Sequence, residues 1–291
     1  MYPASFEYLR PGTISEAIAL LGQHGDDAKI LSGGQSLIPM MKLRVARPAW
    51  LIDIGRIPGL AHIKEEGGHL RIGGLVREAD LEASDLIRSK FPIIHDTAMV
   101  IADPLVRNLA TVGGNLAHGD PANDHPATML ALGAKVVATG PRGEREIPIT
   151  DFFVSIFTTA LEPNEILTEI RIPTPDPRNG GAYFKLERKV GDFATAAVAV
   201  QVTLNPDGTC KTAGIGLTNV GPTPLKATKA EDFLRGKKLD AAAIDQAGQL
   251  AADAAEPSSD LRGPAEFKKG LVKEFTRRGL RRAIERAGGA R

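Results

Sequence analysis

Two diglycine loops carry the residue types in this chain that are best suited to bind an anion. The first spans residues 31–36 (LSGGQS) and the second residues 111–116 (TVGGNL). Each places a hydroxyl side chain before its glycines and a carboxamide after them. Glycine lets the backbone bend so that its N–H groups, with short polar side chains, can surround an anion. The repeated order of residue types therefore predicts a diphosphate-binding site built from both loops.

The surroundings of the loops leave two other interpretations to weigh. A single diglycine pair is also typical of a plain tight turn, since 31 of the 291 residues are glycine. The second loop continues into residues 118–124 (HGDPAND), where hydrogen-bond donors and acceptors are frequent. His118, Asp120, Asp124 and His125 cluster there, but their spacing matches no common zinc pattern. Hydrogen bonding within the loop is therefore favoured over a metal site.

Composition excludes several classes of function. Hydrophobic residues make up 43% of the chain and charged residues 24%, which is typical of a globular protein with a core. The net charge of +1 gives no reason to expect a nucleic-acid or membrane surface. No segment approaches the roughly 18 consecutive apolar residues of a membrane span, and no signal peptide is recognisable, so a cytoplasmic location is expected. The single cysteine, Cys210, cannot supply an iron–sulfur cluster or a cysteine-rich zinc site.

Common nucleotide and hydrolase motifs are missing from the sequence. No Gly-x-Gly-x-x-Gly follows an expected strand, with Gly214 and Gly216 the nearest approach, and no P-loop or Gly-x-Ser-x-Gly elbow occurs. The basic segment 265–286 is interpreted as a solvated or partner-facing helix, because no stacking aromatics accompany it. A bound nucleotide would therefore be held by another kind of fold.

Local patterns predict an α+β protein in three parts. Thr13 and Glu16 form a capping box that begins a helix. The first part, 1–55, is expected to contain strands 28–31 and 50–54 around a helix at 36–43. The second part, 56–177, should hold a hairpin at 61–74 with its turn at 65–68, helices 77–84, 91–101 and 124–132, and strands 135–139 and 166–172. The third part, 178–291, follows a linker at 173–181 and should contain strands 182–189, 194–204 and 210–217, then helices 225–234, 241–255 and 265–286.

Four segments in this order resemble the FAD-binding medium subunit of molybdenum hydroxylases. They are residues 29–37, 110–116 with Asp120 and Asp124, 165–173, and 185–194. The resemblance is to the carbon monoxide dehydrogenase medium-subunit type, a relative of the flavin domain of xanthine dehydrogenase, and it covers almost the whole chain. It implies a two-subdomain FAD-binding domain of the PCMH, or vanillyl-alcohol-oxidase, type. A C-terminal α+β domain with a three-stranded antiparallel sheet and helices should follow and cover one side of the cofactor.

The same resemblance implies noncovalent FAD, with no catalytic acid or base and no metal ligand in this chain. Both loops would hold the diphosphate and ribityl groups, Lys185 would place positive charge near the flavin, and Phe193 could stack on one face of its ring. The implied contacts are Lys29, Ile30, Leu31, Ser32, Gly33, Gly34, Gln35, Ser36, Leu37, Ile101, Thr111, Gly113, Gly114, Asn115, Asp120, Asp124, Leu167, Lys185, Asp192 and Phe193.

The family role that follows is electron transfer. The chain would take electrons from the [2Fe-2S] clusters of a small partner subunit and pass them through FAD to an external acceptor. A large molybdopterin subunit would carry the substrate site, and the assembly is expected to be a dimer of heterotrimers. Two alternatives stay open: a self-contained flavoenzyme acting on a small molecule, and a nucleotide-binding module without redox activity.

Overall fold

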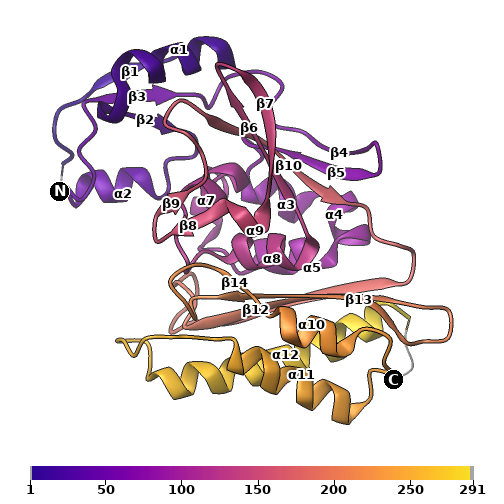
Figure 1. Cartoon of the computed structure of the whole chain (residues 1–291). Helices are drawn as coiled ribbons and strands as arrows, with labels where there is room; N and C mark the ends of the chain where they lie inside the picture. Colours follow the sequence, from indigo (N-terminus) through magenta and orange to yellow (C-terminus); the bar gives the residue numbers. More distant parts are fainter. Residues whose placement is uncertain (1, 289–291) are drawn as a thin grey trace.

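The first part of the chain is a small parallel sheet covered by a helix. A computed structural model describes residues 2–288. Strands β1 (Glu7–Leu9), β2 (Ala28–Leu31) and β3 (Trp50–Asp53) pair in the order β1-β3-β2, with α1 (Ile14–His24) above them and α2 (Leu37–Lys42) leaving the sheet after β2 (Figure 1). β1 is an addition to the expected elements. Its three residues are too few for a recognisable alternation of apolar and polar side chains.

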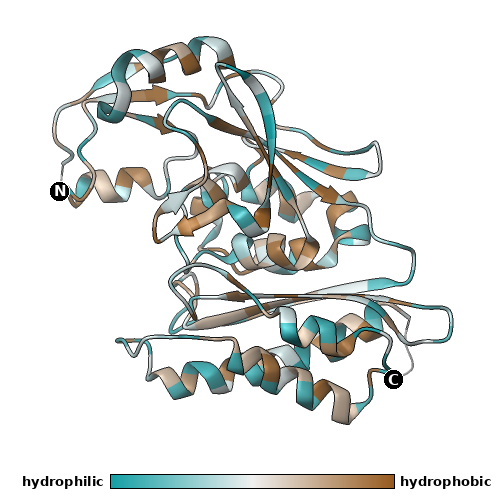
Figure 2. Ribbon diagram, in the orientation of Figure 1, coloured by the Kyte–Doolittle hydropathy of each residue, from teal (hydrophilic) through white to brown (hydrophobic). Residues whose placement is uncertain are grey.

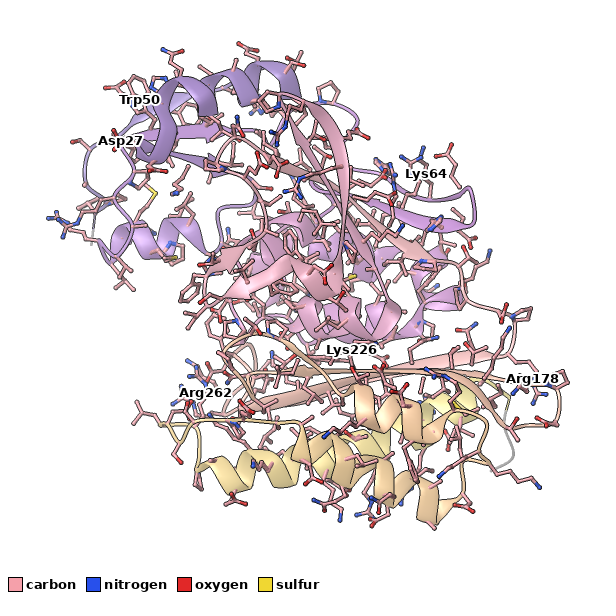
Figure 3. All side chains as sticks on the ribbon, viewed as in Figure 1. Asp27, Trp50, Lys64, Arg178, Lys226 and Arg262 are labelled. Carbon is pink, nitrogen blue, oxygen red and sulfur yellow. The ribbon has the colours of Figure 1, made fainter. Side chains whose placement is uncertain are left out.

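The predicted N-cap of α1 at Thr13 is confirmed, but the predicted capping box is only half formed. The Thr13 hydroxyl accepts the Glu16 N–H at 3.2 Å, whereas the Glu16 carboxylate accepts the N–H of Gly12 rather than that of Thr13, at 2.7 Å. The helix ends at Gly25, which has a positive φ of 55°. Below it, the ring of His24 stacks on Trp50 of β3 with 4.0 Å between centroids (Figure 3 labels Trp50). This stacking fixes α1 over β3, the neighbour of β2, which leads into the first diglycine loop.

The second part is an antiparallel five-stranded sheet backed by helices. The sheet has the order β4-β5-β10-β6-β7. Its strands are β4 (Ile63–Glu66), β5 (His69–Gly73), β6 (Lys135–Gly140), β7 (Gly143–Pro148) and β10 (Ile166–Pro173). Its helices are α3 (Glu78–Ala83), α4 (Asp85–Lys90), α5 (Pro92–Met99), α6 (Pro104–Arg107), α7 (Val112–Ala117), α8 (Asp124–Leu132) and α9 (Ile149–Phe152), and β8 (Phe153–Ser155) and β9 (Thr158–Thr159) form a small hairpin. The turn expected at 65–68 is restricted to Gly67 and Gly68, because both have positive φ, as a two-residue hairpin turn requires.

The third part is an antiparallel sheet with helices on its far side. β11 (Asn179–Leu186), β12 (Ala196–Leu204) and β13 (Cys210–Thr218) pair in sequence order, as predicted. A fourth strand, β14 (Leu225–Lys226), adds to β13, so the three-stranded prediction was one short strand too few. The helix expected from residue 225 begins instead at Thr228, as α10 (Thr228–Leu234). α11 (Ala241–Asp253) and α12 (Ala265–Arg286) complete the layer.

One face of α12 is buried. The helix is therefore not only the solvated or partner-facing element that its basic residues predicted. Val272, Phe275 and Leu280 contribute to the core beneath the C-terminal sheet, and Figure 2 shows hydrophobic and hydrophilic residues alternating around the helix. Lys268 is buried as well, with its Nζ 2.8 Å from the Asp260 carboxylate. The positive charges of α12 thus belong partly to the internal structure of this layer.

Helix α8 lies between the five-stranded sheet and the C-terminal sheet and joins the two parts. It packs on β12 and β13, and the central core includes Tyr183 and Ala197 from the C-terminal sheet (Figure 1). Gly214 and Gly216 make this approach possible, because a Cβ at either position would overlap a carbonyl oxygen of α8. The glycine pair that superficially approached a dinucleotide motif therefore serves helix packing.

No helix of residues 2–288 combines the length and the apolar character needed to cross a membrane.

Candidate cofactor-binding site

The two diglycine loops face one shared cavity of about 390 Å³. The first loop connects β2 to α2, and the second forms the start of α7, where Thr111 is the N-cap. The hydroxyl oxygens of Ser32 and Thr111 lie 2.8 Å apart and join the loops directly. Residues from both loops line the cavity: Ser32, Gly33, Gly34, Gln35, Ser36, Leu37, Thr111, Gly113, Gly114 and Asn115.

The glycines bring the loop backbones into close contact. A Cβ on Gly33 would overlap the carbonyl oxygen of Leu109, and a Cβ on Gly113 would lie 2.5 Å from that of Gly74. Gly34 has a φ of +74°, a conformation that other residues rarely adopt. Gly33 therefore serves packing between the loops, Gly113 serves packing against the residue after β5, and Gly34 serves the bend of the first loop.

Hydrogen-bonding groups in the cavity are left free for a ligand. Within residues 2–288 the backbone N–H groups of Gly33–Ser36 have no acceptor. The Oδ1 atom of Asn115 is buried and has no hydrogen-bond partner there either. Buried polar groups in proteins are normally paired, so a set of free donors and an unpaired carboxamide fits a polar guest. The residues present therefore suit the diphosphate and hydroxyl groups of a dinucleotide such as FAD.

The other half of the cavity is mainly apolar, and the sequence analysis did not predict most of it. Lys29, Ile30 and Leu167 belong to the expected contacts and line the cavity. Their unpredicted neighbours are Leu21, Ala28, Ile54, Leu161, Pro163 and Ile166, with Glu162 and Glu165 at the same end. These residues come from α1, β2, the end of β3, the turn before β10 and the start of β10. Glu165 and Ile166 fall in the family-like segment 165–173 but were not among the expected contacts, and no motif marks the others.

His118 is another cavity residue that was not among the expected contacts. It follows α7 directly, and its ring lies 5.1 Å from that of Phe157, centroid to centroid. Burial lowers the pKa of His118, although the charge of Asp120 acts in the opposite direction. A neutral imidazole beside the cavity can both donate and accept a hydrogen bond.

Asp124 and Lys185 lie outside this cavity and form a buried pair between the second part of the chain and the C-terminal sheet. Lys185 Nζ is 2.9 Å from Asp124 Oδ2 and 3.0 Å from the carbonyl oxygen of Val100, to which it donates. The Tyr183 hydroxyl donates to Asp124 Oδ1 at 2.6 Å. Burial raises the pKa of Asp124, while Lys185 and Tyr183 oppose this rise, and burial also raises the pKa of Tyr183 well above its usual range.

We call the surface where the second part of the chain meets the C-terminal sheet, around Asp124 and Lys185, the interdomain seam. The remaining expected contacts lie at this seam or in local turns. Ile101 is buried next to Val100, and Ala102 beside it packs against Gly191. Asp120 accepts the N–H of Ala122 at 2.9 Å, a bond within its own turn. Leu31 sits behind the first loop, with its side chain beside Gly34.

Asp192 and Phe193 lie on the outer side of the seam. Phe193 is about half exposed, and the guanidinium of Arg262 lies 6.0 Å from the centre of its ring. Figure 3 labels Arg262 on the connection that precedes α12. Burial acts to raise the pKa of Asp192, but hydrogen bonds from Arg188 and Arg262 outweigh it and lower that pKa to about 2. Asp192 therefore orders the segment that carries Phe193.

Most of the expected contacts thus form two groups. One lines the cavity with the diglycine loops, and the other lies outside it, at the Asp124–Lys185 pair and in the Asp192–Phe193 segment, whereas Leu31 and Asp120 belong to neither. The first group offers N–H and hydroxyl donors for an anion. The second offers a compensated charge and an exposed aromatic ring next to the interdomain seam. Across residues 2–288 there is no group of three or more His, Cys, Asp or Glu side chains arranged to hold a metal ion.

Comparison with known proteins gives matches along the whole chain. Residues 4–175 match the family described as FAD binding domain in molybdopterin dehydrogenase, and residues 181–283 match the CO dehydrogenase flavoprotein C-terminal domain. The carbon monoxide dehydrogenase medium chain of Afipia carboxidovorans is 48% identical over 287 residues, covering 99% of both chains. The 6-hydroxypseudooxynicotine dehydrogenase complex subunit alpha of Paenarthrobacter nicotinovorans is 37% identical, covering 99% of this chain and 97% of its own.

Solved structures agree with these relatives. A chain of carbon monoxide dehydrogenase from Hydrogenophaga pseudoflava superposes with a TM-score of 0.95 at 47% identity, covering 98% of this chain and 99% of that chain. The expected FAD-binding domain followed by a C-terminal flavoprotein domain is therefore confirmed. The chain belongs to the FAD-binding medium-subunit family of the molybdenum hydroxylases, and it is an oxidoreductase subunit.

Proposed function

We propose that this chain holds FAD noncovalently with its diphosphate between the two diglycine loops. The free N–H groups of Gly33–Ser36 and the unpaired Asn115 carboxamide support this placement. The adenine would lie in the apolar half of the cavity near Ala28 and Ile166, where a flat base gains from leaving water. The isoalloxazine would extend toward the Asp124–Lys185 pair.

The single observation that carries this assignment is the shared cavity. Ser32 and Thr111 come from different parts of the chain, yet both line the cavity and their hydroxyl groups lie 2.8 Å apart. A turn with a purely structural role does not require a second turn opposite it. Here both turns have the same order of hydroxyl, glycines and carboxamide, which a shared ligand explains.

The role proposed for the chain's own residues near the ring is electrostatic and steric. Bound FAD would supply the redox chemistry, because a flavin can exchange one or two electrons. Lys185 is compensated by Asp124 at 2.9 Å, so its effect on the flavin potential should be smaller than that of an unpaired lysine. Ile101 and Phe193 would limit the access of water to the ring, with Asp192, held by Arg188 and Arg262, keeping the Phe193 segment in place.

For the electron route, we propose entry from the iron–sulfur clusters of a small partner subunit and exit to an external acceptor. The only cysteine, Cys210, is buried, and burial raises the pKa of its thiol to about 11, which suits packing rather than ligation of a cluster. The printed names of the relatives, a medium chain and a complex subunit, support an assembly of several chains. We further propose that a large molybdopterin subunit is the second partner, that the three chains assemble as a dimer of heterotrimers, and that the complex is cytoplasmic. Within this chain, the proposed functional units are residues 1–55, 56–177 and 178–291.

The test is to purify the chain alone and with its two partners. We expect the isolated chain to bind one FAD and to show no turnover with NAD(P)H, whereas the complex should reduce its flavin when the large subunit receives substrate. Rapid reduction of the isolated chain by NAD(P)H would favour a self-contained flavoenzyme. A colourless chain with no affinity for FAD would favour a nucleotide-binding module without redox activity.

A further inference from the structure

Glu78 and His125 form a buried pair that the proposed function does not use. Glu78 is the first residue of α3 and His125 the second of α8, and both side chains have zero exposure. Glu78 Oε2 and His125 Nε2 are 2.6 Å apart. This hydrogen bond connects α3 with α8, which also packs on the C-terminal sheet.

On one side, the pair adjoins the scaffold of the second diglycine loop. The N–H of Glu78 donates to the carbonyl oxygen of Ala110 at 3.0 Å, and that of Val112 donates to Val76 at 3.0 Å. Arg77 forms an isolated β-bridge with Thr111. The segment 76–78 therefore holds residues 110–112 from behind, directly before Gly113 and Gly114.

On the other side, His125 follows Asp124 in α8. Asp124 bonds to both Tyr183 and Lys185 of the C-terminal sheet. The distance between the diphosphate end and the ring end of the site thus depends partly on how α8 sits relative to segment 76–78, together with the hydrogen bond from Asn123 Nδ2 to the Asn115 carbonyl oxygen at 2.8 Å. Glu78 and His125 make a direct side-chain contact between these two elements.

The Glu78–His125 pair is not an effective way to stabilise the folded state. Glu78 Oε1 and His125 Nδ1 are both buried without a hydrogen-bond partner in the described part of the chain. Unpaired buried polar atoms cost free energy, and replacing a buried polar pair by apolar residues of similar size is often neutral or stabilising. What a hydrogen bond adds over an apolar contact is direction.

We propose that Glu78 and His125 are positioning residues, which keep the second diglycine loop and the Asp124–Lys185 pair in register for a cofactor that spans both. This inference rests on the proposed binding of FAD. It assigns to the pair a function in cofactor affinity that is separable from folding. A ligand that reaches only the diphosphate end, such as ADP, should be less sensitive to the pair than FAD.

The test compares FAD and ADP binding by calorimetry on the apo chain. The variant Glu78→Met/His125→Leu replaces the pair by apolar residues of similar volume. Its control is Thr97→Val/Thr128→Val, which removes another fully buried pair, 2.6 Å apart, that joins α5 to α8. Within residues 2–288 these two hydroxyl groups make no hydrogen bond to the second diglycine loop. We expect the first variant to keep its melting temperature, lose at least fivefold in FAD affinity and lose less than twofold in ADP affinity. The control should retain FAD affinity within twofold.

A second comparison keeps the proposal testable if the double variant does not fold. Glu78→Gln preserves a hydrogen-bonding group of the same size and should bind FAD within twofold of the wild type, whereas Glu78→Met should bind it at least fivefold more weakly. Unchanged FAD affinity in the apolar variants would overturn the proposal. So would a parallel loss of FAD affinity, ADP affinity and melting temperature, because that is the signature of a structural role. Failure of the wild-type chain to bind FAD would instead refute the proposed function itself.

Discussion

The hydroxyl groups of Ser32 and Thr111 lie 2.8 Å apart although 79 positions separate the two residues in the sequence. This contact joins a loop of the parallel sheet to a loop of the five-stranded part. Thr111 also accepts the N–H of Gly114 at 3.2 Å and so begins α7. A single pair of side chains thus fixes both sides of the proposed diphosphate site.

Removing these hydroxyls should weaken FAD binding. Ser32→Ala loses one hydrogen bond, and Thr111→Val loses that bond and the helix cap, so we expect costs of about 1 and about 2 kcal/mol in binding. Fluorescence titration of the apo chain with FAD measures both. Thr150→Ala, in the exposed start of α9, is the control and should bind like the wild type. Equal affinities across all four proteins would contradict the assignment.

A methyl group on the first loop should separate the two loops. Gly33→Ala places a Cβ on the carbonyl oxygen of Leu109, and such overpacking typically costs about 1–3 kcal/mol of folding stability. We also expect at least a tenfold loss of FAD affinity. Gly22→Ala is the matched control, since a Cβ there meets nothing within 4 Å inside α1, and it should stabilise the chain by about 0.5–1 kcal/mol. Urea unfolding measures the free energy of unfolding of both variants. An unchanged free energy of unfolding for Gly33→Ala would contradict the close packing of the two loops.

Breaking the pair at the interdomain seam should cost stability in a pH-dependent way. Lys185→Met leaves the Asp124 carboxylate buried without its cation, at a typical cost of about 3–5 kcal/mol. Burial already raises the pKa of Asp124 in the folded chain, so the unfolded chain releases this proton at lower pH and stability falls as pH rises. The variant should therefore recover part of its loss under acidic conditions. Adding Asp124→Asn should restore stability at neutral pH, and a double variant as unstable as the single one would contradict this account.

Asp192 should contribute stability with the opposite pH dependence. Its pKa of about 2 in the folded chain lies below the ordinary value of 3.8, so its stabilising effect is present above 3.8 and is lost as pH falls toward 2. Allowing for solvent screening, we expect Asp192→Asn to cost about 1 kcal/mol at neutral pH. The difference from the wild type should vanish near the acid end of a pH series of unfolding curves. A difference that is constant with pH would show that charge plays no part.

Local sequence patterns predicted the elements that are long or marked by caps and turns. α1, with its cap at Thr13, and α8, which begins at Asp124, were both anticipated, as were the three main strands of the C-terminal sheet. β7 was not, because only Ile147 of its six residues is buried and its charged side chains show no alternation. β14 is two residues long and depends on its partner strand rather than on its own sequence.

Non-local features of the site were harder to predict. The two loops could be recognised because each carries its own motif. The apolar half of the cavity is assembled from single residues of separate elements, such as Leu21 and Ile54, which have no distinctive neighbourhood in sequence. Asp124 and Lys185 were implied only by family resemblance, since their contact spans 61 positions along the chain. The Glu78–His125 pair could not be recognised as a pair. His125 stood out only as a neighbour of His118 and Asp120, and an acidic residue such as Glu78 at the start of a helix is ordinary.

The most direct test of the central claim is a high-resolution structure of the chain with FAD bound. We predict that the diphosphate accepts hydrogen bonds from backbone N–H groups of residues 33–36 and also contacts residues 113–115. A diphosphate that touches only one loop, or that lies outside the cavity between them, would contradict the account.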